Sequence, residues 1–149
     1  MVAALHVAWA TGRVEGHAVL GRSPAQIEES FGAPVSVERY PVRRDFRYRR
    51  FEVIFGDGLH ASALLVTGVA APAAFRAVLQ RTPGLHESRR FRCDARGCFG
   101  TFFTGDRRVR VIYGLNGGRP YAGVQVWPAH RGSSACATRP ESPTFSITR

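Results

Sequence analysis

Alternating apolar and polar positions recur along most of the chain and predict β-strands. After residue 50, the side chains of Phe51, Val53 and Phe55 fall on one side of an extended chain, with Arg50 and Glu52 on the other. This is the pattern of a half-buried antiparallel strand. Turn sequences bounded by Gly, Asp and Asn separate such segments, so strands are expected at about 36–42, 46–55, 59–67, 88–93, 99–104, 107–113 and 120–127.

Two short segments have helical periodicity instead. The first begins with an N-cap signal, because Ser23 is followed by Pro24 at the first helical position and by Gln26, which completes a capping box. Ile27 and Phe31 stand four residues apart, so one face of this helix is expected to pack on the sheet.

The second helix is expected over residues 72–81, with Phe75, Val78 and Leu79 on its buried face. In the first helix, Glu28 and Glu29 are expected to favour the positive end of the helix dipole. Because adjacent helical residues point about 100° apart, these two carboxylates do not form a catalytic pair.

These elements predict an α+β fold: an antiparallel sheet of about six or seven strands with two short helices on one face and the other face partly exposed. The order of helix and meander recurs in residues 20–67 and 72–127, which suggests a tandem repeat inside a single domain of residues 20–130. Residues 131–149 lack periodicity and are expected to form a disordered tail. The expected core is Ile27, Phe31, Phe51, Val53, Phe55, Leu64, Phe75, Leu79, Val109, Val111, Val124 and Val126.

The chain is strongly basic. It has 149 residues and a formal charge of +10, and all 21 of its basic residues are arginine. Such a charge attracts nucleic acid nonspecifically at low salt. No apolar run approaches the roughly 20 residues of a membrane-spanning helix, so no transmembrane segment is expected.

Two cysteines, Cys93 and Cys98, flank a short loop that contains Gly97, and they are expected to form a disulfide. Residues 1–19 offer a related hint, because their apolar stretch ends in Ala8-Trp9-Ala10, a small-x-small pattern that precedes secretory cleavage points. That segment is either a signal-peptide remnant or a first β-strand. A disulfide favours an extracytoplasmic or secreted location, with a cytoplasmic location as the alternative.

No motif for catalysis, for a cofactor or for a metal is found. The chain lacks a nucleophile elbow, a phosphate-binding loop and a dinucleotide fingerprint. A zinc site needs more ligands than one cysteine pair, and the five histidines lie far apart in the sequence. Asp57, between two glycines, is interpreted as a turn residue. We therefore expect no catalytic, cofactor-binding or metal-binding residues.

Aromatic and arginine side chains are the candidates for binding. A stripe from Arg39 to Phe51 mixes guanidinium groups with rings, and Tyr121 and Trp127 alternate with the core positions Val124 and Val126 of the last strand. The candidate interaction surface consists of Arg43, Arg44, Arg47, Tyr48, Tyr121 and Trp127.

The segments from Leu20 to Pro34 and from Tyr48 to Gly58 resemble the opening of the SmpA/OmlA lipoprotein family. They contain a Gly-x-Ser helix start, a Gly-x-Pro stop and a strand that ends in a Phe-Gly-Asp-Gly turn. Members of this family resemble the β-lactamase-inhibitor-protein fold. The resemblance implies a small extracytoplasmic α+β domain that binds other proteins through a sheet face, without a cofactor. Because Cys93 is the first cysteine, lipid anchoring near the start of the chain is not carried over.

Two functions follow as hypotheses. The first is a noncatalytic protein-interaction module, exported, that binds a protein partner of unknown identity through an aromatic and Arg-rich sheet face. The alternative is a nucleic-acid-binding protein that uses the stripe of residues 39–51.

Overall fold

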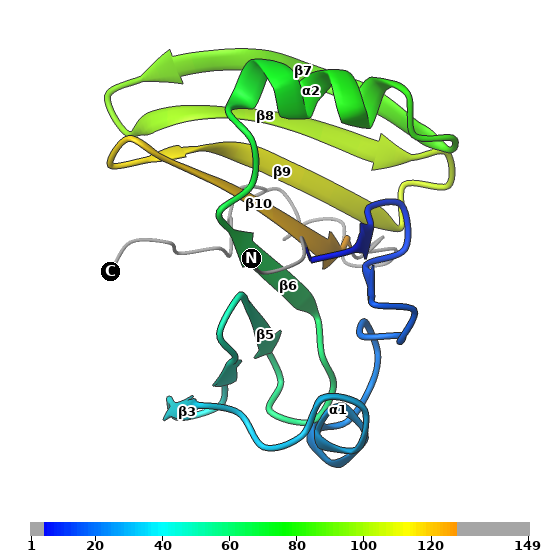
Figure 1. The fold of residues 1–149 in the computed structure, drawn as a ribbon, viewed down its shortest axis with the longest axis vertical. Coiled ribbons are helices and arrows are strands. Elements are labelled where there is room, and N and C mark those ends of the chain that lie inside the picture. The colour runs from blue at the N-terminus through cyan, green and yellow to red at the C-terminus, as the bar shows by residue number, and fades with distance from the viewer. Residues whose placement is uncertain (1–4, 128–149) are drawn as a thin grey trace, which may run out of the picture.

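Ten strands and two helices make up residues 5–127, the part of the chain that the computed structural model describes (Figure 1). The expected tail of residues 131–149 lies outside the described residues. In chain order the elements are β1 (Val7–Ala8), β2 (Arg13–Val14), α1 (Pro24–Phe31), β3 (Ser36–Arg39), β4 (Arg44–Arg47), β5 (Phe51–Phe55), β6 (Ala63–Thr67), α2 (Pro72–Gln80), β7 (Leu85–Asp94), β8 (Gly97–Thr104), β9 (Val109–Asn116) and β10 (Arg119–Val126).

Eight of the strands form one antiparallel sheet in the order β3-β4-β5-β6-β10-β9-β8-β7, and β1 pairs with β2. The fold is therefore α+β with an antiparallel sheet, as predicted, but the sheet has eight strands rather than six or seven. The expected strand at 46–55 is two strands, because the chain turns between Arg47 and Phe51, where the amide of Tyr48 donates to the carbonyl oxygen of Phe51. This turn contains no Gly, Pro or Asn, so its residue types do not identify it.

The predicted start of α1 is confirmed. The side chain of Ser23 accepts from the amide of Gln26, the Gln26 side chain accepts from the amide of Ser23, and Pro24 occupies the first turn. The expectation for Glu28 and Glu29 is wrong, because no acidic residue lies in the first turn, where the dipole field acts.

Helix α2 also begins at a proline, Pro72, but its N-cap is Ala71, which offers no side-chain hydrogen bond. Phe75 and Leu79 are buried as predicted, whereas Val78 is 40% exposed and does not belong to the buried face. The ring of Trp9, which follows β1, meets the Phe75 ring edge-on at 4.9 Å. The N-terminal hairpin therefore packs against the helix-covered side of the sheet.

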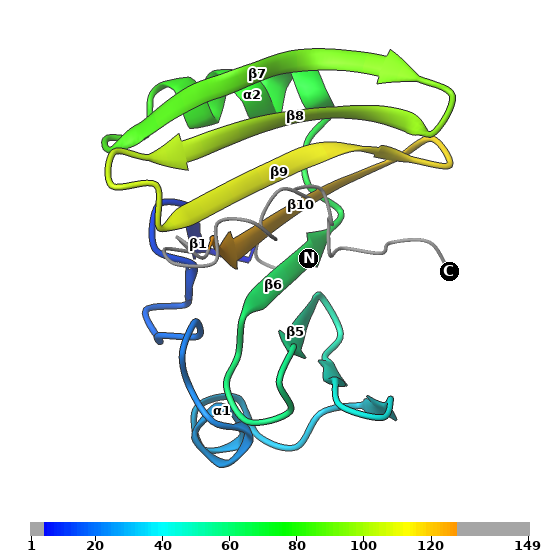
Figure 2. The same cartoon turned by 180° about the vertical axis from the view of Figure 1, so that it is seen from behind.

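Both helices bury their apolar residues in one cluster, which identifies the face of the sheet that they cover. The cluster contains Ile27 of α1 and Phe75 and Leu79 of α2, together with side chains from β4, β5, β6, β8, β9 and β10. In Figure 1, α2 lies in front of β7 and β8, and the half-turn to Figure 2 brings the sheet in front of α2. All but one of the predicted core residues belong to this cluster or pack against it. The exception is Val126, which is 41% exposed at the last position of β10.

The predicted disulfide joins Cys93 and Cys98, which face each other across the β7–β8 hairpin. Their Cα atoms are 3.8 Å apart, below the expected window of about 4.4–6.8 Å, and both residues lie within the paired strands rather than in the loop. Neither described helix has the length and apolarity that crossing a membrane requires.

Candidate functional site

The face of the sheet opposite the helices is the candidate site, and we call it the helix-free face. The register of the strands decides which side chains reach it. Residues opposite each other in an antiparallel pair point to the same side, and Ile112 pairs with both Thr101 and Gly123. Alternation along each strand then assigns the other members, which include Glu38, Asp45, Arg47, Glu52, Ile54, Ala63, Leu65, Phe99, Phe103, Arg110, Tyr121 and Gln125.

An apolar strip crosses the middle of this face. Ile54, Ala63 and Ile112 form a second buried cluster, separate from the main core, and the half-buried side chains of Leu65 and Tyr121 pack against it. Burial raises the pKa of the Tyr121 hydroxyl, so this group stays neutral at physiological pH.

Guanidinium groups lie over aromatic rings at the β7–β10 end of the face. The guanidinium carbon of Arg107 is 4.0 Å from the centroid of the Phe103 ring, and that of Arg110 is 4.0 Å from the Trp127 ring. The Phe103 and Trp127 rings meet edge-on at 5.8 Å. These contacts are cation–π interactions, and they keep the two guanidinium groups stacked on the rings at the surface of the helix-free face.

Two further contacts extend this group of side chains. Arg110 Nε donates to Gln125 Oε1 at 2.9 Å, and Arg110 Nη2 donates to the same oxygen. At the β7 edge, the guanidinium carbon of Arg89 lies 5.6 Å from the Phe99 ring centroid. We call Arg89, Phe99, Phe103, Arg107, Arg110 and Trp127 the basic-aromatic group.

The opposite end of the face, on β3–β5, carries carboxylates. Asp45 is 1% exposed, and its two oxygens accept from Nε and Nη2 of Arg43, both at 2.8 Å. Arg47 Nη2 lies 3.2 Å from Glu38 Oε1 and 3.4 Å from Glu52 Oε2. The hydrogen bond to Asp45 raises the pKa of Arg43, and burial raises the pKa of Glu52.

This carboxylate cluster has the spacing of a metal site, since one oxygen from each of Glu38, Asp45 and Glu52 lies within 4.8 Å of the others. The chemistry does not fit a metal ion, however, because Arg43 occupies both oxygens of Asp45 and Arg47 bridges the other two carboxylates. The guanidinium groups supply the positive charge that a cation would supply, so the cluster is an ion-pair network.

The six residues predicted as an interaction surface do not lie on one face. Arg43, Arg47, Tyr121 and Trp127 belong to the helix-free face, although at different ends of it. Arg44 lies on the opposite side, where it pairs with the buried core residue Phe55.

Tyr48 also lies on the helix-covered side. Its ring stacks on Phe51 at 4.9 Å, its hydroxyl donates to the carbonyl oxygen of Gly32 at 2.8 Å, and burial raises its pKa to about 12. Tyr48 therefore helps to pack the end of α1 against the sheet and does not lie on the helix-free face.

The stripe of residues 39–51 is split by the same alternation. Arg43 and Arg47 point to the helix-free face and are ion-paired there. Arg39 pairs in register with Arg44 on the other side, and Arg49 lies in the turn between β4 and β5. The guanidinium groups therefore form no continuous row along one strand.

Sequence reasoning missed Arg89, Arg107 and Arg110 as members of the site. Alternation along β8 places Phe99 and Phe103 on one face, but the arginines reach these rings from other strands and from a turn. Only the pairing of β8 with its neighbours brings them together.

Comparison of the chain with protein-family models, with curated proteins and with solved structures found no match.

Proposed function

We propose that this protein is a noncatalytic protein-interaction module that binds its partner through the helix-free face of the sheet. The observation that carries the proposal is the division of that face: an apolar strip separates the basic-aromatic group from the ion-paired carboxylate cluster. An apolar centre with charged flanks is the general composition of a protein interface.

The residue types at the basic-aromatic end support a protein partner. Trp, Tyr and Arg are the residues that most often carry binding energy in interfaces, because each presents a large surface with a polar group. Trp127 and Tyr121 are half-buried, and their rings are fixed by neighbours, so binding orders them little further.

Charge indicates what the partner carries. The guanidinium groups of Arg89 and Arg107 lie over rings on this face. Glu87, an acidic residue of β7 near Arg89, points to the helix-covered side and pairs with Arg76. The partner is expected to place acidic groups opposite this end and apolar side chains opposite the strip.

The same division counts against nucleic acid as the partner. A polyanion laid along the face would meet Glu38, Asp45 and Glu52 at its β3–β5 end, and the arginines there are already paired. An oligonucleotide titration at rising salt tests the alternative, because nonspecific binding disappears by physiological ionic strength.

A photo-reactive amino acid placed on each side of the sheet tests the proposal. Thr67 is exposed on the helix-free face beside Tyr121, and Gln80 is exposed on α2. A protein is expected to cross-link from position 67 and not from position 80. Equal cross-linking from both positions, or cross-linking to nucleic acid instead of protein, would overturn the proposal.

A charge-reversal pair adds a matched control. R89E/R107E should abolish the cross-link from position 67, because it reverses the charge of the basic-aromatic group. R81E/R96E changes the net charge by the same amount at exposed positions off this face and should leave the cross-link intact. Loss of the cross-link in both variants would indicate that only net charge matters.

We propose further that the protein works outside the cytoplasm and that its two halves descend from one duplicated unit. The disulfide supports the location, since such bonds persist in oxidising compartments. The topology supports duplication, since each half has one helix followed by four strands, and the halves join through their last strands, β6 and β10.

A further inference from the structure

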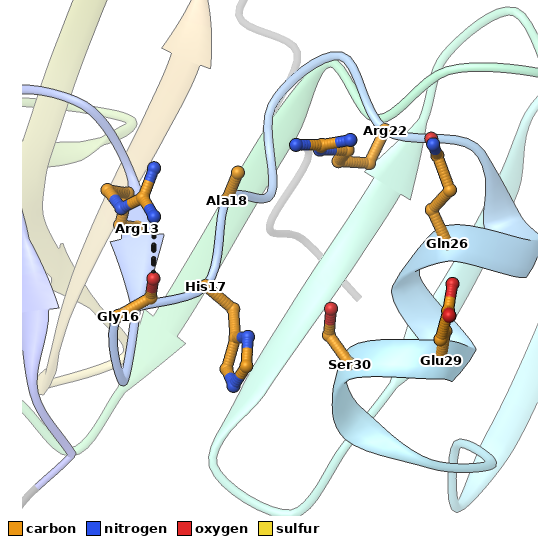
Figure 3. A pocket seen from close by; sticks show the side chains of 8 residues that line it. All are labelled: Arg13, Gly16, His17, Ala18, Arg22, Gln26, Glu29 and Ser30. Carbon is orange, nitrogen blue, oxygen red and sulfur yellow. Dashed lines mark hydrogen bonds between the residues drawn. The ribbon is translucent and has the colours of Figure 1, made fainter.

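A polar pocket of about 260 Å³ lies between the N-terminal hairpin and α1, away from the helix-free face (Figure 3). Arg13 comes from β2, His17 and Arg22 from the segment between β2 and α1, and Glu29 and Ser30 from α1. Two arginines, a histidine and one carboxylate thus line the same small space.

The two arginines are held on an ordered backbone. Arg13 Nη2 donates to the carbonyl oxygen of Gly16 at 2.7 Å, which leaves its other N–H donors available. The carbonyl oxygen of Arg22 accepts from the amide of the buried residue Ala61 at 2.8 Å, and the Ala61 carbonyl accepts from the amide of Gly21 at 2.7 Å. The backbone at Arg22 and the guanidinium group of Arg13 are therefore held in place.

The Arg22 side chain has donors to spare. It extends over the pocket beside Ala18 and Gln26 (Figure 3), and it forms no ion pair with any residue between 5 and 127. A guanidinium group is planar and matches the geometry of an oxyanion with two parallel hydrogen bonds. The pocket therefore offers an anion-binding group that the fold itself leaves unused.

The other side of the pocket carries hydrogen-bonding groups of both kinds. The His17 ring is oriented by an edge-on contact with Phe31 at 5.5 Å, and Ser30 adds a hydroxyl. Glu29 can only accept hydrogen bonds when ionised, so a ligand that touches it must carry a donor. An oxyanion that also bears a hydroxyl satisfies the arginines and Glu29 together.

We propose that this pocket binds a phosphate group that retains one proton, as in hydrogen phosphate. The volume suits so small a ligand. By this measure of volume one water needs only about 10–15 Å³, so the space is large enough for phosphate with part of its hydration. It lies below the range of about 300–1,000 Å³ that larger organic ligands occupy.

Sulfate is the decisive comparison, because it has the size and charge of hydrogen phosphate but no hydroxyl at neutral pH. Calorimetric titration at about pH 8 measures both anions, because inorganic phosphate is then mainly the dianion that retains one proton, with the same charge as sulfate. Phosphate is expected to bind saturably and about tenfold more tightly than sulfate. Absence of saturable phosphate binding, or equal affinity for both anions, would overturn the proposal.

Variants assign the roles. R22Q should weaken phosphate binding about tenfold, while R96Q, with the same net charge and a change in the exposed β7–β8 turn, should leave it unchanged. E29Q should raise the affinity for sulfate and remove the preference for phosphate. R13Q provides a second arginine variant, with circular dichroism to establish that each variant is folded. Equal loss in R22Q and R96Q would show that the anion responds to net charge and not to this pocket.

Methyl phosphate distinguishes free phosphate from a phosphate ester. As a dianion, this ester has no hydroxyl group, so it is expected to bind about as weakly as sulfate. Binding of methyl phosphate as tight as that of hydrogen phosphate would contradict the role assigned to Glu29.

Discussion

Tyr113 on β9 places its ring directly over Gly100 on β8, its partner in the sheet register. A Cβ atom added to Gly100 would lie 2.5 Å from Cζ and from the hydroxyl oxygen of Tyr113. Tyr113 is fully buried, with Phe75, Phe91 and Phe102 around it at centroid distances of 5.8–6.0 Å. The glycine is therefore required by packing: the ring occupies the space that a side chain at position 100 would take.

Substitution of Gly100 with alanine should destabilise the protein. The Tyr113 ring has no room to move, so the added methyl group forces strain of about 1–3 kcal/mol in the free energy of unfolding. Urea denaturation measures this loss. Gly105→Ala is a control, because nothing lies within 4 Å of a Cβ at that position. An unchanged stability of G100A would contradict the packing described.

Substitution of Tyr113 with phenylalanine should instead stabilise the protein. The Tyr113 hydroxyl is buried and has no hydrogen-bond partner among the described residues, and burial raises its pKa. Removal of an unsatisfied buried hydroxyl while the ring is kept should stabilise the fold by about 1 kcal/mol. Thermal denaturation of Y113F beside the wild type checks this. A lower melting temperature in Y113F would show that the hydroxyl has a partner.

The sequence predicted those elements that depend on neighbouring residues, such as a helix cap or a half-buried strand. The capping residues of α1 determine its start, and alternation in β5 correctly assigned Phe51, Val53 and Phe55 to one face. The eighth strand was missed because Arg47 to Phe51 turns without a turn-forming residue. The turn is determined by the pairing of β4 with β5, and no residue type in the local sequence indicates it.

The candidate site was predicted only in part, for the same reason. Tyr121 and Trp127 reach the helix-free face as alternation requires, but Tyr48 is turned to the other side by the β4–β5 turn and is held there by Gly32. The arginines over Phe99 and Phe103 depend on the register between strands. Composition identifies such side chains, but it does not say which of them meet.

Loss of Arg43 should cost more stability than loss of its partner Asp45. R43Q leaves the buried Asp45 carboxylate without its bidentate partner, and an uncompensated buried charge costs about 3–5 kcal/mol. D45N leaves Arg43, which is 29% exposed, able to reach water, and should cost about 1 kcal/mol. Guanidinium denaturation compares both with R49Q, which changes an exposed turn residue. A larger loss in D45N than in R43Q would contradict this assignment.

The disulfide should be closed in the folded protein and contribute modestly to its stability. The chain has 3 cysteines, so folded, unreduced protein should show at most one reactive thiol and reduced, unfolded protein three. Free reaction of both Cys93 and Cys98 would remove the chemical support for export. Because the two are 5 residues apart, closing the loop limits the unfolded chain little, and C93S/C98S should lose at most about 2 kcal/mol.

Asp57 should give the protein a stability that disappears in acid. Its carboxylate accepts from the amides of Leu59 and His60, each at 2.7 Å, and these bonds, with that to the His60 side chain, lower the pKa of Asp57 to about 2 from its ordinary 3.8. A carboxyl group with a lower pKa in the folded state stabilises the fold above its unfolded pKa. This stabilisation is lost as the pH falls from about 4 towards about 2.

D57N keeps the shape of the side chain but removes this titration. The variant should melt at a lower temperature than the wild type at pH values above about 4, and the difference should shrink towards about pH 2, where the wild-type carboxylate is protonated as well. Thermal unfolding followed by circular dichroism in steps of pH measures the difference. The wild type at neutral pH provides the reference. A difference that stayed constant down to about pH 2 would show that the Asp57 charge does not hold the turn after β5.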